Sequence, residues 1–151
     1  MKRLLLMSGI HHPEGWVTLD ANPANKPDWL ADIPAFLGPL RDTVWDHIEW
    51  IHGITSLYPW DAMDALLQIR GWMIAPDGLL VLEQPDYHHA KWAIPSVFGD
   101  PEPREPLHMN RWAYTPESLA AAVRDAGFTR VEILPAQHHN PARDFRLEAR
   151  P

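Results

Sequence analysis

Apolar and polar residues alternate in short blocks through the first third of the chain, and charges or turn residues bound each apolar block. The blocks have the length of strands and are too short for typical helices. We therefore expect four strands, over Arg3–Met7, Trp16–Leu19, Asp28–Ile33 and Thr43–Ile48. The first is apolar at nearly every position, which is typical of a strand buried on both faces of a parallel sheet.

The pattern changes to that of a helix at Asp61–Met73. Four apolar residues there recur at helical spacing and share one face: Ala62, Leu66, Ile69 and Met73. The proline and glycine of Ala75–Gly78 predict a turn, and the apolar run Leu79–Leu82 after it is the clearest strand in the sequence. Pro85 is expected to end that strand, because proline donates no hydrogen bond to a sheet.

Residues 87–113 show no periodicity and are dense in proline, glycine and charge. Long irregular loops in compact domains are usually functional or mobile, so we expect a loop that covers a substrate. A second helix follows, with Thr115 as its N-cap, Pro116 at its first position and Gly127 as its C-cap. Its predicted apolar face consists of Leu119, Ala122, Val123 and Ala126.

The last two apolar stretches, Thr129–Leu134 and Asp144–Ala149, are joined by a polar turn and predict a hairpin. Strands that alternate with helices favour a mainly parallel sheet, and a closing hairpin makes its last strand antiparallel. The predicted fold class is therefore α/β. The chain of 151 residues fits one domain, residues 1–151.

Composition narrows the function classes. Because the chain has no cysteine, disulfides, thiolate metal ligands and thiol catalysis are excluded. A net charge of −7 argues against general nucleic-acid binding. No apolar run approaches the roughly 20 residues of a membrane span, and the run at the start is too short for a signal peptide, so we expect a cytoplasmic protein. The 8 tryptophans exceed what a small core needs, and a homodimer would use some of them.

Several segments match one known family in order and spacing. They are "GWVTLDANP", "DWLADIP", "DTVWDHIEWI", "ALLQIRGWMIAPDGLLVLEQPD" and "NRWAYTPESLAAAVRDAGFTRVEI". Together they cover nearly the whole chain, and the sequence resembles the small class I S-adenosylmethionine-dependent methyltransferases. The resemblance implies a Rossmann-like sheet of seven strands with the last one antiparallel. It also implies S-adenosylmethionine as the cofactor.

The same resemblance implies a cofactor site at the ends of the first strands. Asp20 stands where the family has the acid that binds the ribose hydroxyls, although such an acid can also be a solvated loop residue. The glycine-rich turn of the family is reduced to "LMSG", which keeps Gly9 after the small Ser8. Eight residues separate the first two strands, too few for a helical crossover. The implied cofactor residues are Ser8, Gly9, Asp20, Asp32, Ile33 and His47.

Six of the 9 histidines form adjacent pairs at 11–12, 88–89 and 138–139. In the expected topology each pair follows a strand at the carboxyl edge, where open α/β sheets bind ligands. Three interpretations stay open: substrate binding or general base catalysis, a metal bound with carboxylates such as Glu49 or Asp86, or ordinary polar loop residues. We assign no metal ligand and take His47, His12 and His88 as candidate catalytic bases.

A methyl acceptor would lie against the residues that flank the irregular loop. The candidates are aromatic, charged or hydrogen-bonding residues: Trp50, Asp86, Tyr87, His89, Arg111, Trp112 and Tyr114. The leading hypothesis is methyl transfer to a small-molecule or sugar-like acceptor. One alternative is a non-catalytic binding or assembly module, which the reduced glycine turn favours. Another is a small histidine-based metal-dependent enzyme.

Overall fold

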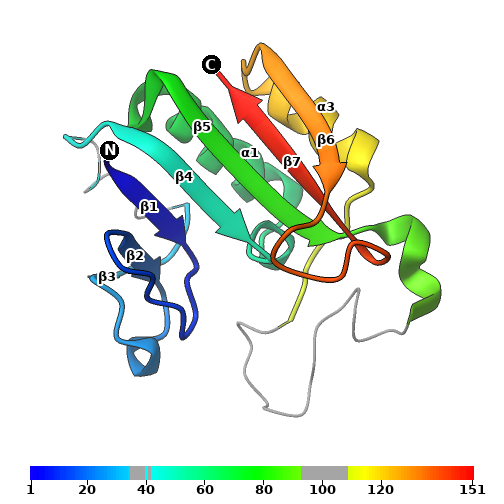
Figure 1. Ribbon diagram of the computed structural model, residues 1–151, viewed down its shortest axis with the longest axis horizontal. Coiled ribbons are helices and arrows are strands. Elements are labelled where there is room, and N and C mark those ends of the chain that lie inside the picture. The colour runs from blue at the N-terminus through cyan, green and yellow to red at the C-terminus, as the bar shows by residue number, and fades with distance from the viewer. Residues whose placement is uncertain (35–39, 41, 93–108) are drawn as a thin grey trace.

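The computed structural model describes residues 1–34, 40, 42–92 and 109–151. These residues form a seven-stranded sheet in the order β3-β2-β1-β4-β5-β7-β6 (Figure 1). The strands are β1 (Arg3–Leu6), β2 (Val17–Asp20), β3 (Trp29–Leu30), β4 (Trp45–Ile51), β5 (Ile74–Pro85), β6 (Arg130–Pro135) and β7 (Asp144–Arg150). β7 is antiparallel to both of its neighbours and the other pairs are parallel. The predicted parallel sheet with an antiparallel terminal hairpin is confirmed.

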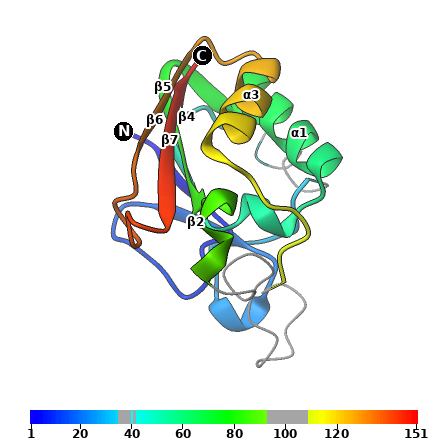
Figure 2. The same cartoon turned by 90° about the vertical axis from the view of Figure 1, so that its right-hand side faces the viewer.

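Two α-helices cover one face of this sheet (Figure 2). Helix α1 (Pro59–Gln68) continues into a π-helical turn, Ile69–Met73. Helix α3 (Pro116–Asp125) starts at Thr115, whose side chain caps it as predicted. Three short 3-10 helices, η1 (Pro23–Asn25), η3 (Ile54–Ser56) and η5 (Tyr87–Trp92), lie in connections. No helix among the described residues is long and apolar enough to span a membrane.

The core lies between the helices and alternate residues of the central strands. In the row Leu6, Trp50, Leu82 and Leu147, each residue is paired in register with the next and is fully buried. The predicted apolar face of Asp61–Met73 belongs to this core, since Ala62 and Leu66 of α1 and Ile69 and Met73 of the π-helical turn are all buried. Leu119 and Val123 of α3 and its C-cap residue Ala126 are buried as expected. Ala122 is only partly buried, whereas Ala120, which was not predicted, is fully buried.

The opposite face of the sheet carries many polar residues. On this face Glu49 of β4 pairs with Val81 of β5, and Glu83 of β5 pairs with Arg146 of β7. Within the described residues no α-helix packs on this face, and the connection from β1 to β2 contains no helix, as its short length predicted. Polar side chains replace helices here because unpaired apolar residues on an open face would stay in contact with water.

Some element boundaries differ from the sequence prediction. Strand β4 begins at Trp45 and runs to Ile51, so Val44 precedes it and is 49% exposed. The predicted turn Ala75–Gly78 lies inside β5. Trp45 pairs with Ile74 and His47 pairs with Leu79, so residues 75–78 lie opposite the single residue Asp46 of β4. The segment is thus a bulge between two central strands, and a local turn signal could not distinguish a bulge from a turn. The third strand shortens to two residues, and residues 93–108 of the predicted loop lie outside the described part of the chain.

Candidate functional site

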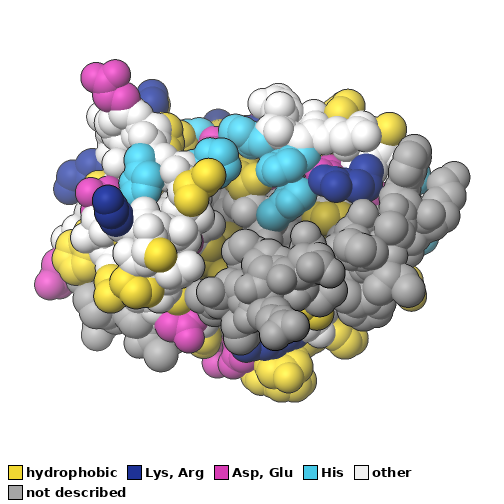
Figure 3. All heavy atoms as spheres, turned by 90° about the horizontal axis from the view of Figure 1, so that it is seen from below, with side chains coloured by type: hydrophobic (Ala, Val, Ile, Leu, Met, Phe, Trp, Pro, Cys, Tyr) yellow, Lys and Arg dark blue, Asp and Glu magenta, His cyan; other side chains and the backbone are white. Residues whose placement is uncertain are grey.

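A cavity of about 990 Å³ opens at the carboxyl ends of the parallel strands. Three segments line most of it: the β1–β2 turn, the residues after β4, and the loop between β6 and β7. Figure 3 views this end of the molecule and shows histidine side chains gathered on it. The sheet edge therefore brings together two of the three predicted histidine pairs, at 11–12 and 138–139, while the pair at 88–89 does not line the cavity.

The β1–β2 turn is held by the carboxylate of Asp20. The backbone N–H of Gly9 donates to Oδ2 at 2.7 Å, and Asn22 N–H and the Asn25 side-chain amide donate to Oδ1 at 2.8 and 3.1 Å. Gly9 has a positive φ of 55°, which a glycine adopts without strain. Since a carboxylate has about four acceptor positions, Asp20 keeps about one for a ligand while it fixes the turn.

Ser8 and His12 also line the cavity. Ser8 is nearly buried, and its backbone N–H bonds the Leu19 carbonyl at 3.0 Å, which closes the turn. His12 lies on the exposed side, with its Nε2 2.7 Å from the Asn25 carbonyl oxygen. Of the three candidate bases, His12 is the one that lines this cavity.

The predicted base and cofactor residue His47 lies elsewhere than expected. It was expected to end the fourth strand, but β4 continues to Ile51, so His47 sits on the open face of the sheet. Its ring lies 5.0 Å from Trp16, and its Nε2 is 3.2 Å from Glu49. Burial opposes ionisation of Glu49, yet hydrogen bonding and charge from His47, with the charge of His138, lower the pKa of that carboxyl. His47 therefore belongs to a polar cluster beside the cavity.

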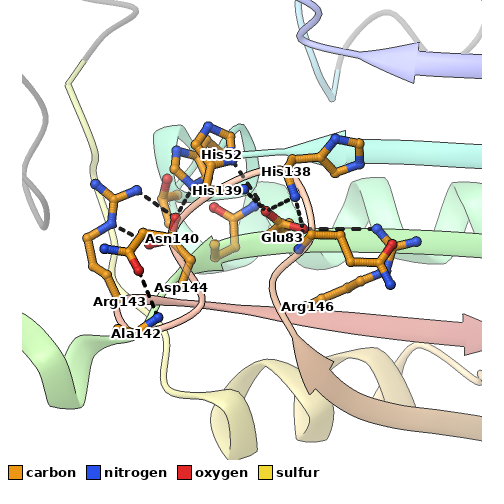
Figure 4. Close-up of polar contacts among 12 residues, drawn as sticks. His52, Glu83, His138, His139, Asn140, Ala142, Arg143, Asp144 and Arg146 are labelled. Atoms are coloured by element: carbon orange, nitrogen blue, oxygen red, sulfur yellow. Dashed lines mark hydrogen bonds and ion pairs between the residues drawn. The ribbon is translucent and has the colours of Figure 1, made fainter.

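His52 occupies the place at the end of β4 that His47 was expected to hold. Its φ is 54°, a conformation uncommon outside glycine. Its Nε2 is 3.0 Å from Oδ2 of Asp144, and its ring stacks on His139 with 3.8 Å between centroids (Figure 4). Burial and the neighbouring His52 lower the pKa of His139, against the opposing effect of Glu83.

Asp144 begins β7 and its side chain is fully buried. The guanidinium of Arg143 donates to both of its oxygens, at 2.5 and 2.6 Å. Burial raises the pKa of Asp144, but the hydrogen bonds from Arg143 and His52 outweigh it and bring that pKa to about 2. Asp144 is therefore a buried, ionised carboxylate behind the cavity-lining residues His52, His139 and Arg143.

Glu83 anchors the loop that carries the last histidine pair. Its carboxylate is fully buried and accepts the backbone N–H groups of residues 137, 138 and 139 at 2.8–3.2 Å. Nδ1 of His139 lies 3.3 Å from the same carboxylate, and Arg146 is 4.0 Å away. The loop conformation, and with it the position of His138 and His139 at the cavity, depends on this one side chain.

A second group of predicted residues surrounds Asp86, after the end of β5. Its two carboxylate oxygens lie 3.4 Å from His88 and 3.1 Å from His89. Neither histidine is among the residues that line the cavity, and the neighbouring Tyr87 is 52% exposed. The candidate base His88 and the candidate substrate residues Asp86, Tyr87 and His89 therefore form a separate surface cluster.

The remaining predicted residues divide between core and surface. Trp50 is fully buried and Ile33 and Tyr114 nearly so, and all three belong to the hydrophobic core instead of lining the cavity. This burial argues against the predicted acceptor role of Trp50 and Tyr114 and the predicted cofactor role of Ile33. Burial raises the pKa of Tyr114 to about 12. The other predicted residues lie on the surface: Asp32, Arg111 and Trp112. The Arg111 guanidinium stacks over Tyr58 and donates to the Ser56 carbonyl oxygen.

Sequence reasoning did not single out His52, Glu83 or Asp144. The signal for His52 was present, because the apolar residues of "HIEWIHG" continue to Ile51 and place a histidine directly after the strand. Glu83 and Asp144 showed no such signal, since the backbone partners of Glu83 and the histidine partner of Asp144 lie 54 or more residues away in the sequence. Long-range pairing of this kind follows from topology and register, which a local pattern does not contain.

No protein-family model matches the sequence, and no curated protein matches it in a sequence search. Solved structures do match the fold. A SAM-dependent methyltransferase from Archaeoglobus fulgidus has a TM-score of 0.71 at 15% identity over 99% of this chain and 86% of its own. The glycopeptide N-methyltransferase MtfA with sinefungin has a TM-score of 0.65 at 15% identity over 99% and 80%.

A third similar structure is PigF with SAH, with a TM-score of 0.65 at 13% identity over 99% of this chain; this chain spans 50% of its length. Identities this low establish the fold and not the activity. The chain therefore has the fold of the class I S-adenosylmethionine-dependent methyltransferases, as its motifs predicted.

Proposed function

We propose that this chain binds S-adenosylmethionine in the cavity at the carboxyl ends of β1, β2 and β4 and transfers the methyl group to a small-molecule acceptor. The supporting observation is the contact between Gly9 and Asp20, 2.7 Å long, which keeps a glycine turn and an acid together at the edge where such sheets bind ligands. Open α/β folds serve many functions, so the proposal rests on this site as well as on the fold.

The residues present suit the cofactor in three respects. A Cβ built on Gly9 would meet no atom within 4 Å, so the turn leaves room for a ligand close to the backbone. Asp20 keeps about one acceptor position for a ribose hydroxyl. The carboxylates of Asp20 and Glu49 both line the cavity and favour a cationic sulfonium by charge.

Bound S-adenosylmethionine would supply an activated methyl group, so the chain itself has mainly to orient the acceptor and exclude water. An acceptor hydroxyl or ammonium would also have to lose a proton, and His12, which lines the cavity, is the proposed base. We further propose that the acceptor is a small or sugar-like molecule held at the same edge of the sheet, on the side of the cavity that Asn110 lines.

The test is calorimetric titration of the purified protein with S-adenosylmethionine and S-adenosylhomocysteine. We expect dissociation constants below about 100 μM, which corresponds to roughly 5.5 kcal/mol. Asp20→Asn keeps the shape of the side chain and removes its charge, and we expect at least about tenfold weaker binding. Asp64→Ala, an exposed aspartate on α1, is the matched control and should bind like the parent.

Thermal melting of each variant separates lost binding from lost folding. Absence of binding by the folded parent at millimolar cofactor would refute the proposal and favour the non-catalytic module. Equal weakening in Asp20→Asn and Asp64→Ala would place the cofactor elsewhere.

Two further parts of the proposal concern the cell and the assembly. We propose a cytoplasmic protein that self-associates through exposed aromatic residues, since such residues are enriched at interfaces. Trp60 is 64% exposed and stacks on Tyr58 with 4.8 Å between ring centroids. Sedimentation of the parent and of Trp60→Ala tests this: a monomeric parent, or a dimer unaffected by the substitution, contradicts it.

A further inference from the structure

Three possible metal ligands converge at the wall of the cavity from separate parts of the chain. His52 follows β4, His139 lies in the loop before β7, and Asp144 begins β7. One ligand atom of each can be chosen so that all three lie within 4.8 Å of one another. Figure 4 shows the two imidazoles side by side above the carboxylate. Two histidines and a carboxylate are a donor set that suits zinc, iron and related divalent metals.

The spacing is close to that of a formed site. In a tetrahedral zinc site with bonds of about 2.0–2.1 Å, neighbouring ligand atoms lie about 3.3 Å apart. The separation of His52 Nε2 and Asp144 Oδ2, 3.0 Å, already matches such an edge. The widest separation is at most 4.8 Å, so about 1.5 Å of movement completes the set. The side chain of His139 is 38% exposed, which leaves room for that movement.

The surroundings of His139 resemble those of a metal-binding imidazole. Its Nδ1 is 3.3 Å from the buried carboxylate of Glu83, so Nε2 is the ring nitrogen that remains for a metal. A carboxylate on the second ring nitrogen fixes the tautomer and orientation of a metal-binding histidine. Glu83 also accepts the backbone N–H of His139 at 2.8 Å, so ring and backbone are held by one group.

Arg143 opposes a metal at this place. Its terminal nitrogen donates to the same Oδ2 of Asp144, at 2.6 Å, that faces His52. A bound divalent metal would have to share that oxygen and would feel the charge of the guanidinium. Substitution of Arg143 should therefore strengthen metal binding. If Arg143 mattered only because it stabilises the loop, the same substitution would not strengthen it.

Other histidine clusters are less suitable. Glu49 contacts His47 and His138 through its two different oxygens, at 3.2 and 3.4 Å, and Asp86 does the same with His88 and His89. Among the residues that the structure describes, His52, His139 and Asp144 form the group whose three ligand atoms come together.

From this geometry we propose that His52 and His139, which line the cavity, and the buried Asp144 beside them bind one divalent transition metal, of the zinc or iron(II) class. Three protein ligands leave a coordination position for water or for an oxygen of a bound molecule. Such a site would hold a ligand in the cavity by a bond to the metal. The proposal does not depend on methyl transfer, since it concerns residues other than Gly9 and Asp20.

The test titrates zinc and cobalt(II) into full-length protein that has been dialysed against a chelator. We expect one zinc per chain in calorimetry, with a dissociation constant in the micromolar range or tighter, and the visible absorption of four-coordinate cobalt. His52→Ala and His139→Ala should each weaken zinc binding by at least about tenfold. Arg143→Gln should tighten it by a few-fold, because a competing cation is removed.

His11→Ala and His89→Ala are the matched controls, one at the cavity and one in the Asp86 cluster. Both should bind zinc like the parent, and thermal melting should show all variants folded. No stoichiometric zinc binding, or equal weakening in the controls, would overturn the proposal. Weaker binding in Arg143→Gln would overturn the assigned geometry. Cofactor titration is a separate measurement, so either proposal can fail without the other.

Discussion

Substitution of Glu83 is expected to destabilise the protein more than any surface change, and the structure gives the size of the effect. The carboxylate is 0% exposed and accepts three backbone N–H groups, those of residues 137, 138 and 139. A buried donor left without a partner costs about 1–3 kcal/mol. Loss of one partner of a buried ion pair costs about 3–5 kcal/mol, and Arg146 lies 4.0 Å away with its side chain 7% exposed.

These contributions overlap, because water and Glu148, 2.8 Å from Arg146, take over part of the lost pairing. We therefore expect Glu83→Ala to lower the free energy of unfolding by about 3–5 kcal/mol. Glu83→Gln keeps one acceptor oxygen and should cost about 1–2 kcal/mol. At about 2–4 °C per kcal/mol for a chain of this size, Glu83→Ala should melt roughly 10 °C below the parent.

Urea denaturation followed by circular dichroism measures these free energies. Glu132→Ala, an exposed residue of the edge strand β6, is the control and should change stability by no more than about 0.5 kcal/mol. Hydrogen exchange at residues 137–139 should also accelerate in Glu83→Ala. A loss below about 1 kcal/mol, or unchanged exchange at these amides, would refute the role assigned to this carboxylate.

Two further predictions concern packing and ionisation. In Gly53→Ala the new Cβ would lie 2.3 Å from Nε1 of Trp50, so we expect the free energy of unfolding in urea to fall by about 1–3 kcal/mol. In Gly71→Ala the new Cβ meets no atom within 4 Å, so this control should be neutral or stabilising. Equal losses in the two variants would contradict this account. Burial raises the pKa of Tyr114 to about 12 from an ordinary 10.0. This difference adds about 2–3 kcal/mol to the free energy of unfolding below pH 10, and the contribution is lost as the pH rises towards 12. Ultraviolet titration should show one tyrosinate that forms only as the pH approaches 12 and that is missing in Tyr114→Phe. Tyr114→Phe should also reduce the alkaline loss of stability; if that variant lacks instead a group that ionises near pH 10, this account is contradicted.

The sequence contained enough to predict the sheet, because helix and strand periodicities are local and their order restricts the topology. Thr115 and Pro116 predicted the start of α3 at its observed position, since capping depends on neighbouring residues alone. The end of β4 was less well defined. The predicted end, Ile48, lies three residues before the observed end, Ile51, so His47 was expected at the strand end, where His52 lies. A strand boundary depends on pairing with other strands, and that information is spread along the chain.

The site was predictable only in outline. Gly9 and Asp20 were identified because a family motif contains both within a dozen residues. The buried pairs of Glu83 with residues 137–139 and of His52 with Asp144 join segments that share no local pattern. Trp50 illustrates the opposite error, because an aromatic residue near a strand end is compatible with both a cleft and a core, and register decides between them.

The position of β7 between β5 and β6 has a consequence for the order in which this molecule can assemble. The glycine turn and Asp20 lie within the first 20 residues, whereas His139 and Asp144 belong to the final hairpin. During synthesis the residues of the proposed ribose contact therefore emerge before His139 and Asp144, the last two of the proposed metal ligands. Because β7 pairs with β5 across more than 50 residues of intervening chain, closure of that pair is a late, entropically costly step. Metal capture would then report completion of the fold, whereas the contact between Gly9 and Asp20 can form before it.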